Sequence, residues 1–337
     1  GIQYCMHEAL DQGNCWVEYE DLVDQANLLL VMDNLDSRIR IEASLDNLIS
    51  ERMLSCESHA GRFLVALSDI LKMEQDIAAI FTKAAESNPH FTSTRNLQKL
   101  ILRQAETLNE KQLEAVHSAL QHSISLISGG AGSGKSYTVS VINAVCEECD
   151  LEVVLSAPTG KAAKRLEEVS GRTGTTIHRL LGYDGKSFSK DSNNPIDADV
   201  LIIDEFSMVD VPLAWHLFNA VDFARTAIVI VGDHNQLPPV GPGNILRDLI
   251  HSNAIPTVIL DKVVRQAGVL KENSTAILKG EVRKTSDAST QGCRDWYLAD
   301  QFTDPGAARN FLLDLFEKRL DALGFDLIKD VQVLTPT

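Results

Sequence analysis

The sequence has no long apolar run, few cysteines and no excess of basic residues. No segment approaches the ~20 consecutive apolar residues of a membrane-spanning helix, so we expect no spanning segment. Six cysteines in 337 residues are too few for a disulfide scaffold, which favours a reducing compartment and a cytoplasmic protein. The chain begins at Gly1 without an initiator methionine or a secretory signal, so we expect it to start inside a longer protein.

Acidic residues outnumber basic ones by 47 to 31, which gives a formal net charge of −16. Proteins held on nucleic acid by their overall charge are basic, so any nucleic-acid binding by this chain requires a local patch. The length fits two or three domains, and 44% hydrophobic with 23% charged residues is typical of globular proteins.

The first 95 residues predict a helical accessory domain. Apolar residues recur there at helical spacing, for example at Leu22, Ala26 and Leu29, and no glycine-rich loop interrupts them. The first 100 residues hold 16 acidic and 8 basic side chains, which accounts for half of the net charge. A polar, turn-rich stretch at 86–90 places the domain boundary near residue 95.

From residue 96 the pattern changes to short apolar runs that alternate with helical segments, which predicts a parallel α/β domain over 96–250. The clearest expected strands are 124–127, 153–156, 200–203 and 227–231. Residues 251–337 begin a further α/β pattern, with a helix expected at 307–320 and a strand at 331–334. We expect this last domain to be incomplete, because the chain stops one strand after its long helix.

The segment 129–136 matches the phosphate-binding pattern G-x-x-x-x-G-K-[ST] and lies between an expected strand and an expected helix. Its glycines let backbone N–H groups surround phosphates, and the helix N-terminus adds positive charge. Lys135 supplies a cation for the β- and γ-phosphates, and Ser136 offers a hydroxyl to Mg²⁺. The residues expected to contact a nucleotide here are Gly129, Gly130, Ala131, Gly132, Ser133, Gly134, Lys135, Ser136 and Tyr137.

Two further strand ends carry side chains suited to the same site. Asp204 and Glu205 follow the apolar strand 200–203, where Asp204 is expected to hold Mg²⁺ and Glu205 to polarise an attacking water. Gln236 follows the next strand with an amide that both donates and accepts hydrogen bonds. Because parallel strand ends share one sheet edge, we expect these residues beside Lys135. The sequence has no further carboxylate cluster of the kind that a two-metal nuclease needs.

A local basic patch lies between residues 161 and 179 of this acidic chain. Five Lys and Arg side chains stand there against only Glu167 and Glu168. Beside a phosphate site, such a patch indicates contact with a nucleic-acid backbone, although a solvated helix face gives the same composition. The strand-end sequence 157–161 favours the first interpretation, because it presents backbone donors, a hydroxyl and a cation together.

Taken in order, the motifs resemble those of superfamily 1 DNA helicases of the RecD/TraA family, which includes the exonuclease V alpha subunit. Besides the phosphate loop, the resemblance rests on 108–112, 157–166 with 176–181, 204–210, 232–243 and 264–267. Phe206 stands where the family usually has a small residue, a departure that leaves both carboxylates intact. The final residues, 331–337, resemble a strand that begins the core of the second domain in this family.

The resemblance implies a P-loop RecA-like sheet domain between the helical domain and the beginning of a second RecA-like domain. It implies ATP and Mg²⁺ as cofactors, single-stranded DNA with 5′-to-3′ polarity, and protein partners in a recombination or repair complex, without a membrane. It assigns catalysis to Lys135, Glu205, Gln236 and Arg265, and contact with the adenine base to Gln112. The DNA contacts that it implies are Pro158, Thr159, Lys161, Lys164, Arg165 and His178.

The family's later motifs are expected beyond Thr337, so the chain alone is predicted to bind ATP–Mg²⁺ better than it hydrolyses it and not to unwind DNA. The residues are also compatible with two other functions. One is a nucleotide-binding regulatory or assembly module without strand separation, and the other is a P-loop ATPase that acts on RNA. The stretch 181–188, with Asp-Gly between aromatic residues, predicts a hairpin.

Overall fold

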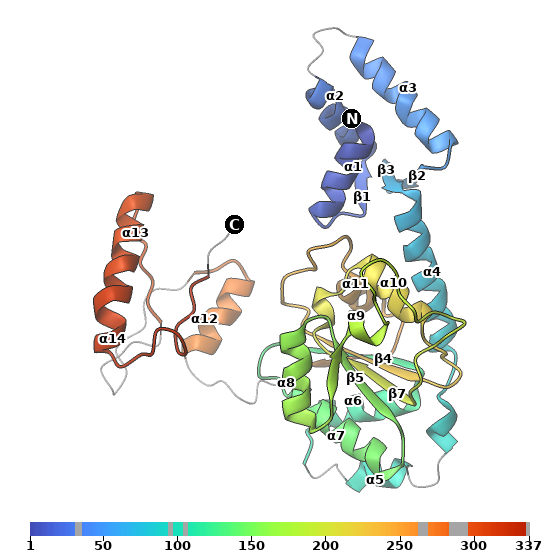
Figure 1. Ribbon diagram of the computed structural model, residues 1–337, viewed down its shortest axis with the longest axis vertical. Helices are drawn as coiled ribbons and strands as arrows, with labels where there is room; N and C mark the ends of the chain where they lie inside the picture. The colour runs from blue at the N-terminus through green and yellow to red at the C-terminus, as the bar shows by residue number, and fades with distance from the viewer. Residues whose placement is uncertain (31–35, 94–96, 104–106, 262–268, 283–295, 335–337) are drawn as a thin grey trace. The chain divides into compact units, whose positions relative to one another are not determined.

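The computed structural model describes residues 1–30, 36–93, 97–103, 107–261, 269–282 and 296–334 (Figure 1). The chain divides into two compact units, Gly1–Arg265 and Gln266–Thr337. The first unit contains an N-terminal region and the main sheet, and both candidate sites described below lie in it. None of the helices in the described ranges is long and apolar enough to cross a bilayer.

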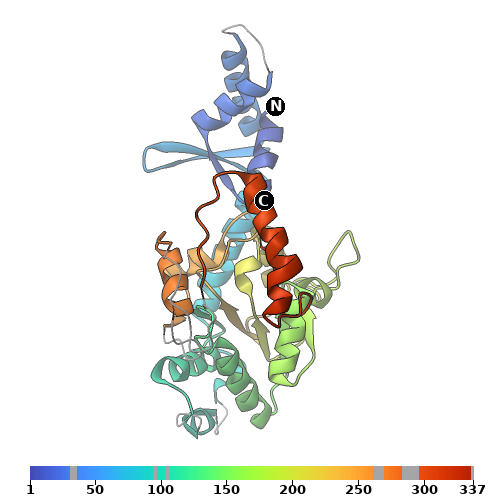
Figure 2. The same cartoon turned by 90° about the vertical axis from the view of Figure 1, so that its left-hand side faces the viewer.

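The N-terminal region combines helices with a small antiparallel sheet. Its sheet has the strand order β1-β3-β2, and Ala60 and Gly61, both with positive φ, form the tight turn between β2 and β3 (Figure 2). The region was expected to be helical, and these strands were not predicted. The apolar residues of β3 lead directly into those of α4, so the whole stretch also fits a helical spacing. The elements are α1 (Ile2–Asp11), β1 (Trp16–Glu18), α2 (Tyr19–Leu30), α3 (Asp36–Ser50), β2 (Leu54–His59), β3 (Arg62–Leu67) and α4 (Ser68–Ala85).

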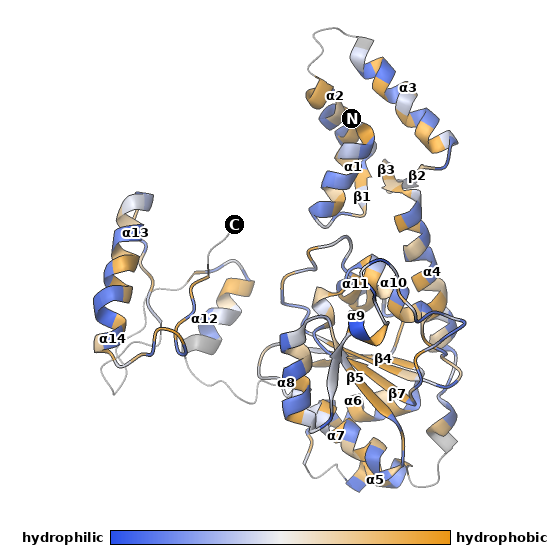
Figure 3. Cartoon of the chain, viewed as in Figure 1, coloured by the Kyte–Doolittle hydropathy of each residue, from blue (hydrophilic) through white to orange (hydrophobic). Residues whose placement is uncertain are grey.

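The main sheet has six parallel strands in the order β6-β5-β7-β8-β4-β9. The strands are β4 (Ile124–Gly129), β5 (Val153–Ala157), β6 (Gly174–Thr176), β7 (Val200–Ile203), β8 (Ala227–Gly232) and β9 (Thr257–Leu260). The four strands expected from the sequence are confirmed, whereas the short edge strands β6 and β9 were not predicted. Figure 3 shows β4 and β7 as strongly hydrophobic, as expected for parallel strands covered on both faces.

Helices cover both faces of this sheet and create two apolar cores. One core includes residues of α10 (Val211–Asn219), α11 (Ile245–Ser252) and α4. The other core includes residues of four further helices of the main sheet domain. The latter helices are α5 (Leu97–Arg103), α6 (Glu110–Gln121), α7 (Lys135–Glu148) and α8 (Gly160–Ser170), and the shorter elements are η1 (His90–Ser93), α9 (Ile177–Leu180) and η3 (Phe206–Met208). Because the strands are parallel and the crossovers return over the faces, the loops after the strands meet at one edge.

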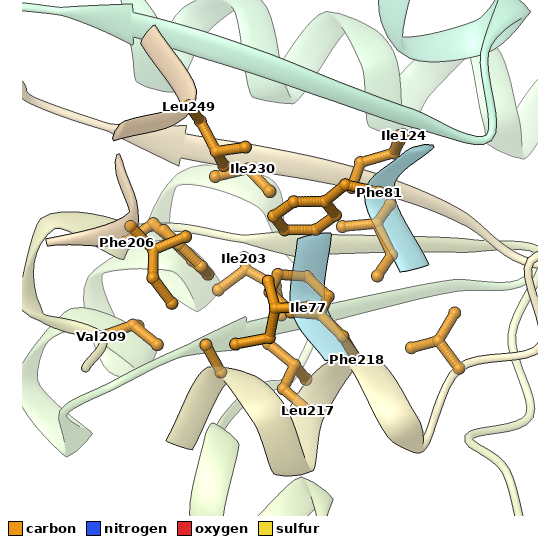
Figure 4. Packing of buried hydrophobic residues seen from close by; sticks show 14 of the residues in the cluster. Ile77, Phe81, Ile124, Ile203, Phe206, Val209, Leu217, Phe218, Ile230 and Leu249 are labelled. Atoms are coloured by element: carbon orange, nitrogen blue, oxygen red, sulfur yellow. The ribbon is translucent and has the colours of Figure 1, made fainter. Parts of the chain in front are cut away.

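Helix α4 ties the N-terminal region to the main sheet. Phe81 of α4 meets Phe218 of α10 edge to face at 4.7 Å between ring centroids, and Figure 4 places both rings in the same apolar cluster. The indole N–H of Trp215 donates to Asp76 of α4 at 3.0 Å. Two residues earlier, Glu74 of α4 accepts a hydrogen bond from the indole of Trp16 at 3.0 Å. Residues before position 95 therefore complete the core under the main sheet.

The sheet also extends past residue 250, where the sequence placed the end of the domain. Strand β9 pairs in parallel with β4, so residues 257–260 are part of the first sheet. The second unit contains α12 (Val269–Leu278), α13 (Pro305–Asp314), η4 (Leu315–Arg319) and α14 (Leu320–Ala322). Its last three elements confirm the expected helix at 307–320.

The prediction of a strand at 331–334 is wrong. These residues carry no strand, because no described residue of the second unit forms a strand with which they could pair. The adjoining residues 335–337 lie outside the described part of the chain.

Candidate nucleotide-binding site and neighbouring strand ends

A pocket of about 410 Å³ lies at the carboxyl ends of β4, β7 and β8. It brings together all of the predicted nucleotide-contacting residues from 130 to 137, both carboxylates after β7, and the glutamine after β8. Its lining consists of Thr107, Gln112, Gly130, Ala131, Gly132, Ser133, Gly134, Lys135, Ser136, Tyr137, Arg165, Asp204, Glu205, Asp233 and Gln236. The volume lies in the range of pockets that hold small-molecule ligands and cofactors.

Glycines shape the loop between β4 and α7 at points where a side chain does not fit. Gly132 and Gly134 have φ values of +78° and +93°, in the left-handed region that favours glycine. A β-carbon at Gly129 would lie 2.7 Å from the carbonyl oxygen of Leu260. Gly129 does not line the pocket itself, so it supports the loop from the strand side.

Lys135 is the first residue of α7, and its ammonium group donates hydrogen bonds to the carbonyl groups of Gly129 and Gly130, the latter at 3.2 Å. These bonds fold the lysine over the loop and keep its charge at the pocket. Ser136 follows on the same first turn and lines the pocket. The first helical turn thus adds its unpaired N–H groups to a cation and a hydroxyl.

Gln112 is locked beside the loop by a reciprocal capping arrangement at the start of α6. Its backbone N–H donates to Asn109 Oδ1 at 3.0 Å, while Asn109 N–H donates to Gln112 Oε1 at 3.1 Å. The buried amide nitrogen of Gln112 lies against Gly134, where a β-carbon would collide with it. The predicted base-contacting residue therefore lines the pocket in a fixed orientation.

The two carboxylates after β7 differ in conformation and environment. The backbone N–H of Asp204 donates to the Ser156 carbonyl at 2.9 Å, which continues the pairing of β7 with β5. Burial raises the pKa of the Asp204 carboxyl, while the charges of Lys135 and Arg165 act in the opposite direction. Glu205 has φ +53°, a left-handed conformation that is strained for a side-chain-bearing residue and often marks functional positions.

The loop after β8 contributes two side chains. Gln236 is exposed at the pocket, and its Oε1 accepts a hydrogen bond from the Ser207 hydroxyl at 3.3 Å. This bond links the glutamine to the turn that follows Glu205. Asp233 is buried, lines the pocket and accepts the Asn235 N–H at 3.0 Å.

Three residues that line the pocket were not predicted to do so from the sequence. Asp233 directly follows β8 just as Asp204 follows β7, so the strand-end rule could have found it. Thr107 precedes α6 and carried no signal of its own. Arg165 was assigned to DNA, but it lines the nucleotide pocket and acts on the Asp204 charge.

The other predicted DNA contacts lie at the ends of the neighbouring strands β5 and β6. Thr159 caps α8, and its hydroxyl accepts the Ala162 N–H at 3.2 Å. Lys161 and Lys164 are exposed on α8, and His178 is exposed on α9, whose own cap is Thr176. Pro158 precedes the first cap. Arg265 lies outside the described residues.

Comparison with known proteins identifies the family. The AAA domain family matches residues 112–242, which include the whole pocket except Thr107. The ATP-dependent RecD2 DNA helicase of Deinococcus radiodurans is 34% identical over 278 residues, which cover 82% of this chain and 36% of that protein. The chain is similar to the RecD-like helicases of superfamily 1. The resemblance inferred from the motifs is thereby confirmed.

Two further proteins are similar to parts of the RecD-like chain. The RecBCD enzyme subunit RecD of Haemophilus influenzae is 36% identical over 164 residues, 41% of this chain and 26% of that protein. A crystal structure of Pif1 helicase from Candida albicans has a TM-score of 0.39 and 24% identity, covering 52% of this chain and 45% of that one. The RecD-like chain thus spans about a third of the length of the first relative and about a quarter of the second.

Proposed function

We propose that this RecD-like chain binds ATP–Mg²⁺ in the pocket at the ends of β4, β7 and β8. We further propose that it is part of an ATP-dependent DNA helicase that acts in recombination or repair. The observation that carries the proposal is the convergence of the phosphate loop, two carboxylates and Gln236 on one pocket of about 410 Å³. The names of the relatives, a DNA helicase and a subunit of the RecBCD enzyme, support the helicase class and the pathway.

The chemistry of the pocket fits a nucleoside triphosphate with its magnesium ion. The loop from Gly130 to Gly134 offers backbone N–H groups, and Lys135 adds a full positive charge beside them. The Ser136 hydroxyl and the Asp204 carboxylate are oxygen ligands of the kind that Mg²⁺ takes together with phosphate oxygens. Bound there, the ion would neutralise charge that develops on the phosphoryl group.

The side chains around these ligands have separate tasks in the proposal. Glu205 would hold a water molecule and accept its proton, a role supported by its position after Asp204 on the pocket wall. Gln236, linked to Ser207, orients the same water or the terminal phosphate. Gln112 donates from its amide nitrogen toward the nucleotide, since its oxygen accepts the Asn109 N–H. Arg265 is retained from the family resemblance as a second cation for the phosphates.

We further propose that single-stranded DNA contacts the ends of β5 and β6 and moves with 5′-to-3′ polarity. Lys161 and Lys164 are exposed there, next to the capped start of α8, and His178 lies on the helix after β6. Pro158 and Thr159 shape this segment, and cations beside it attract a phosphate backbone despite the acidic total charge. Protein partners in a repair complex and a cytoplasmic location complete the proposal.

ATP turnover with and without single-stranded DNA tests the proposed function. The assay measures phosphate release by the chain in Mg²⁺, with Lys135→Ala as the blank. A nucleotide titration runs alongside, and we expect this chain alone to bind ATP–Mg²⁺, to hydrolyse it weakly at most, and to lose the binding in the blank. ATP binding without any affinity for single-stranded DNA would instead favour the regulatory or assembly module. Equal affinity for RNA of the same sequence would contradict the preference for DNA.

A further inference from the structure

The loop 181–190, which follows α9, is a rigid turn. Asp184 Oδ1 accepts the N–H groups of Lys186 and Ser187, each at 2.8 Å, and these donors lower the pKa of the Asp184 carboxyl. Gly182 has φ +65° and packs so closely on Ser189 that a β-carbon would collide with its hydroxyl. The hairpin expected for 181–188 is therefore present only as a turn, without paired strands.

Three aromatic rings cluster on this loop and the helix before it. The Tyr183 ring lies 4.8 Å from that of Phe188 at an interplanar angle of 38°, and 5.5 Å from His178 at 72°. Phe188 also lies 5.8 Å from His178. These separations are typical of favourable aromatic pairs, so the rings hold one another in place. Tyr183 is 45% exposed and His178 is also exposed, whereas Phe188 is partly buried.

The cluster is anchored in the body of the first unit. The ring centroid of Phe188 lies 4.4 Å from that of His216 on α10. The ring centroids of His216 and Trp215 are 4.9 Å apart. The Trp215 indole is in turn fixed by its hydrogen bond to Asp76 of α4. Tyr183 is thus held through a continuous series of contacts rather than resting on a free loop. A ring that is fixed before binding loses little conformational entropy when a flat ligand stacks on it.

The charges around Tyr183 favour an anionic ligand. Arg179 and Lys186 are exposed nearby in the sequence, and among the described residues neither forms an ion pair. The Asp184 carboxylate is occupied by the backbone N–H groups of its own turn. An exposed aromatic face beside cations is the combination that binds unpaired nucleobases and the phosphates that join them.

We propose that the Tyr183 ring is a stacking platform for one unpaired base of single-stranded DNA. The loop follows β6, the strand beside β5, so the platform continues the strand-end surface that carries Lys161. Phe188, His216 and Trp215 position the ring without touching the DNA. The inference rests on the proposed function, because it assumes that this surface binds single strands, and it adds a contact to the base where the basic residues contact phosphates.

The test measures binding of two fluorescein-labelled oligonucleotides of equal length, oligo-dT and the same backbone with abasic sites. Tyr183→Ala is expected to weaken oligo-dT binding roughly fivefold or more, the loss typical of one base–aromatic stack. Its affinity for the abasic strand should equal that of the wild type. Tyr183→Phe should bind oligo-dT as the wild type does, because stacking needs the ring and not its hydroxyl.

Tyr4→Ala is the matched control, since Tyr4 is 55% exposed on α1 and bonds only to Glu8 among the described side chains. It should leave both affinities unchanged. Unchanged oligo-dT binding by Tyr183→Ala, or an equal loss on both strands, would overturn the stacking platform while leaving the DNA-binding proposal intact. Failure of the wild type to bind either strand would instead overturn the proposed function and the platform with it. Thermal unfolding and ATP binding of each variant verify that the fold is retained.

Discussion

Gly134 of the phosphate loop and Gln112 of α6 are packed so closely that a β-carbon on Gly134 would collide with the Gln112 amide nitrogen. The amide cannot easily move away, because its oxygen accepts the Asn109 N–H in the capping arrangement. The glycine also has φ +93°. The loop and the start of α6 therefore fix each other, so the position expected to contact the base and the phosphate cradle are set together.

Gly134→Ala should therefore weaken nucleotide binding at least tenfold and destabilise the fold. The left-handed conformation alone costs an alanine about 1–2 kcal/mol, and the clash with Gln112 adds to that cost. A fluorescent ATP titration and thermal unfolding measure the two effects. Gly130→Ala is the control for stability, because a β-carbon there meets no atom within 4 Å. Normal nucleotide affinity in Gly134→Ala would contradict the proposed coupling.

Asp204→Asn should raise thermal stability at neutral pH while it abolishes Mg²⁺-dependent turnover. Burial raises the pKa of Asp204, so the ionised carboxylate is less favourable in the folded chain than in the unfolded one. The amide removes that cost, and each kcal/mol gained corresponds to roughly 2–4 °C in Tm. As the pH falls through the raised pKa, the wild type protonates and the advantage of Asp204→Asn should shrink.

Thermal unfolding without nucleotide or Mg²⁺ checks this prediction between neutral pH and about pH 5. A lower Tm of Asp204→Asn at neutral pH would mean that hydrogen bonds and the nearby cations outweigh the cost of burying the carboxylate. Such carboxylates retained at the expense of stability are expected where the ionised form is needed for function.

Arg165 and Lys161 lie one turn apart on α8 but should act on different ligands. Arg165 lines the nucleotide pocket and interacts with the Asp204 charge, whereas Lys161 is exposed at the end of β5 and does not line the pocket. We expect Arg165→Ala to weaken ATP binding more than DNA binding, and Lys161→Ala to do the reverse. Parallel titrations of both variants with ATP and oligo-dT measure the difference. Equal losses of DNA affinity in both variants would mean that Arg165 contacts DNA, as first predicted.

Much of the site could be predicted because its signals are local in the sequence. The phosphate loop and Asp204 directly follow buried apolar strands, and Gln236 lies in the loop after β8. Parallel pairing brings such strand ends to one edge. Arg165 could not be placed in the same way. It lies on a helix whose polar face was read as one basic patch. Lys161 lies one turn away on that same face, so only the position of α8 beside the pocket distinguishes the two residues.

The N-terminal region was harder to predict for a related reason. Strand β1 pairs with β3 across about fifty residues, a contact that no local pattern reveals. The role of α4 was also hidden, because an amphipathic helix shows that one face is buried but not against what. Its partner turned out to be α10, more than a hundred residues later in the chain.

Phe81 and Phe218 should couple the N-terminal region to the main sheet in folding. Both rings are buried, and they meet edge to face at 4.7 Å. Each substitution to alanine should cost about 3–5 kcal/mol in the free energy of unfolding. The double substitution should cost less than the sum by about 0.5–1.5 kcal/mol.

Urea denaturation followed by circular dichroism measures these free energies. Phe63→Ala serves as the control, because Phe63 is 60% exposed and its loss should change stability by about 0.5 kcal/mol or less. Two separate unfolding transitions, with only one of them sensitive to Phe81→Ala, would show that the regions fold independently.

Direct titration of ATP–Mg²⁺ tests the central claim, that the pocket at the ends of β4, β7 and β8 is a nucleotide site. Isothermal calorimetry with the wild type should give saturable binding of one nucleotide per chain. Lys135→Ala should lose most of this affinity, because its ammonium group is the cation that the loop carbonyls hold at the pocket. Thermal unfolding of Lys135→Ala should match the wild type without nucleotide. Absence of binding by the wild type, or equal affinity in the folded Lys135→Ala variant, would contradict the account.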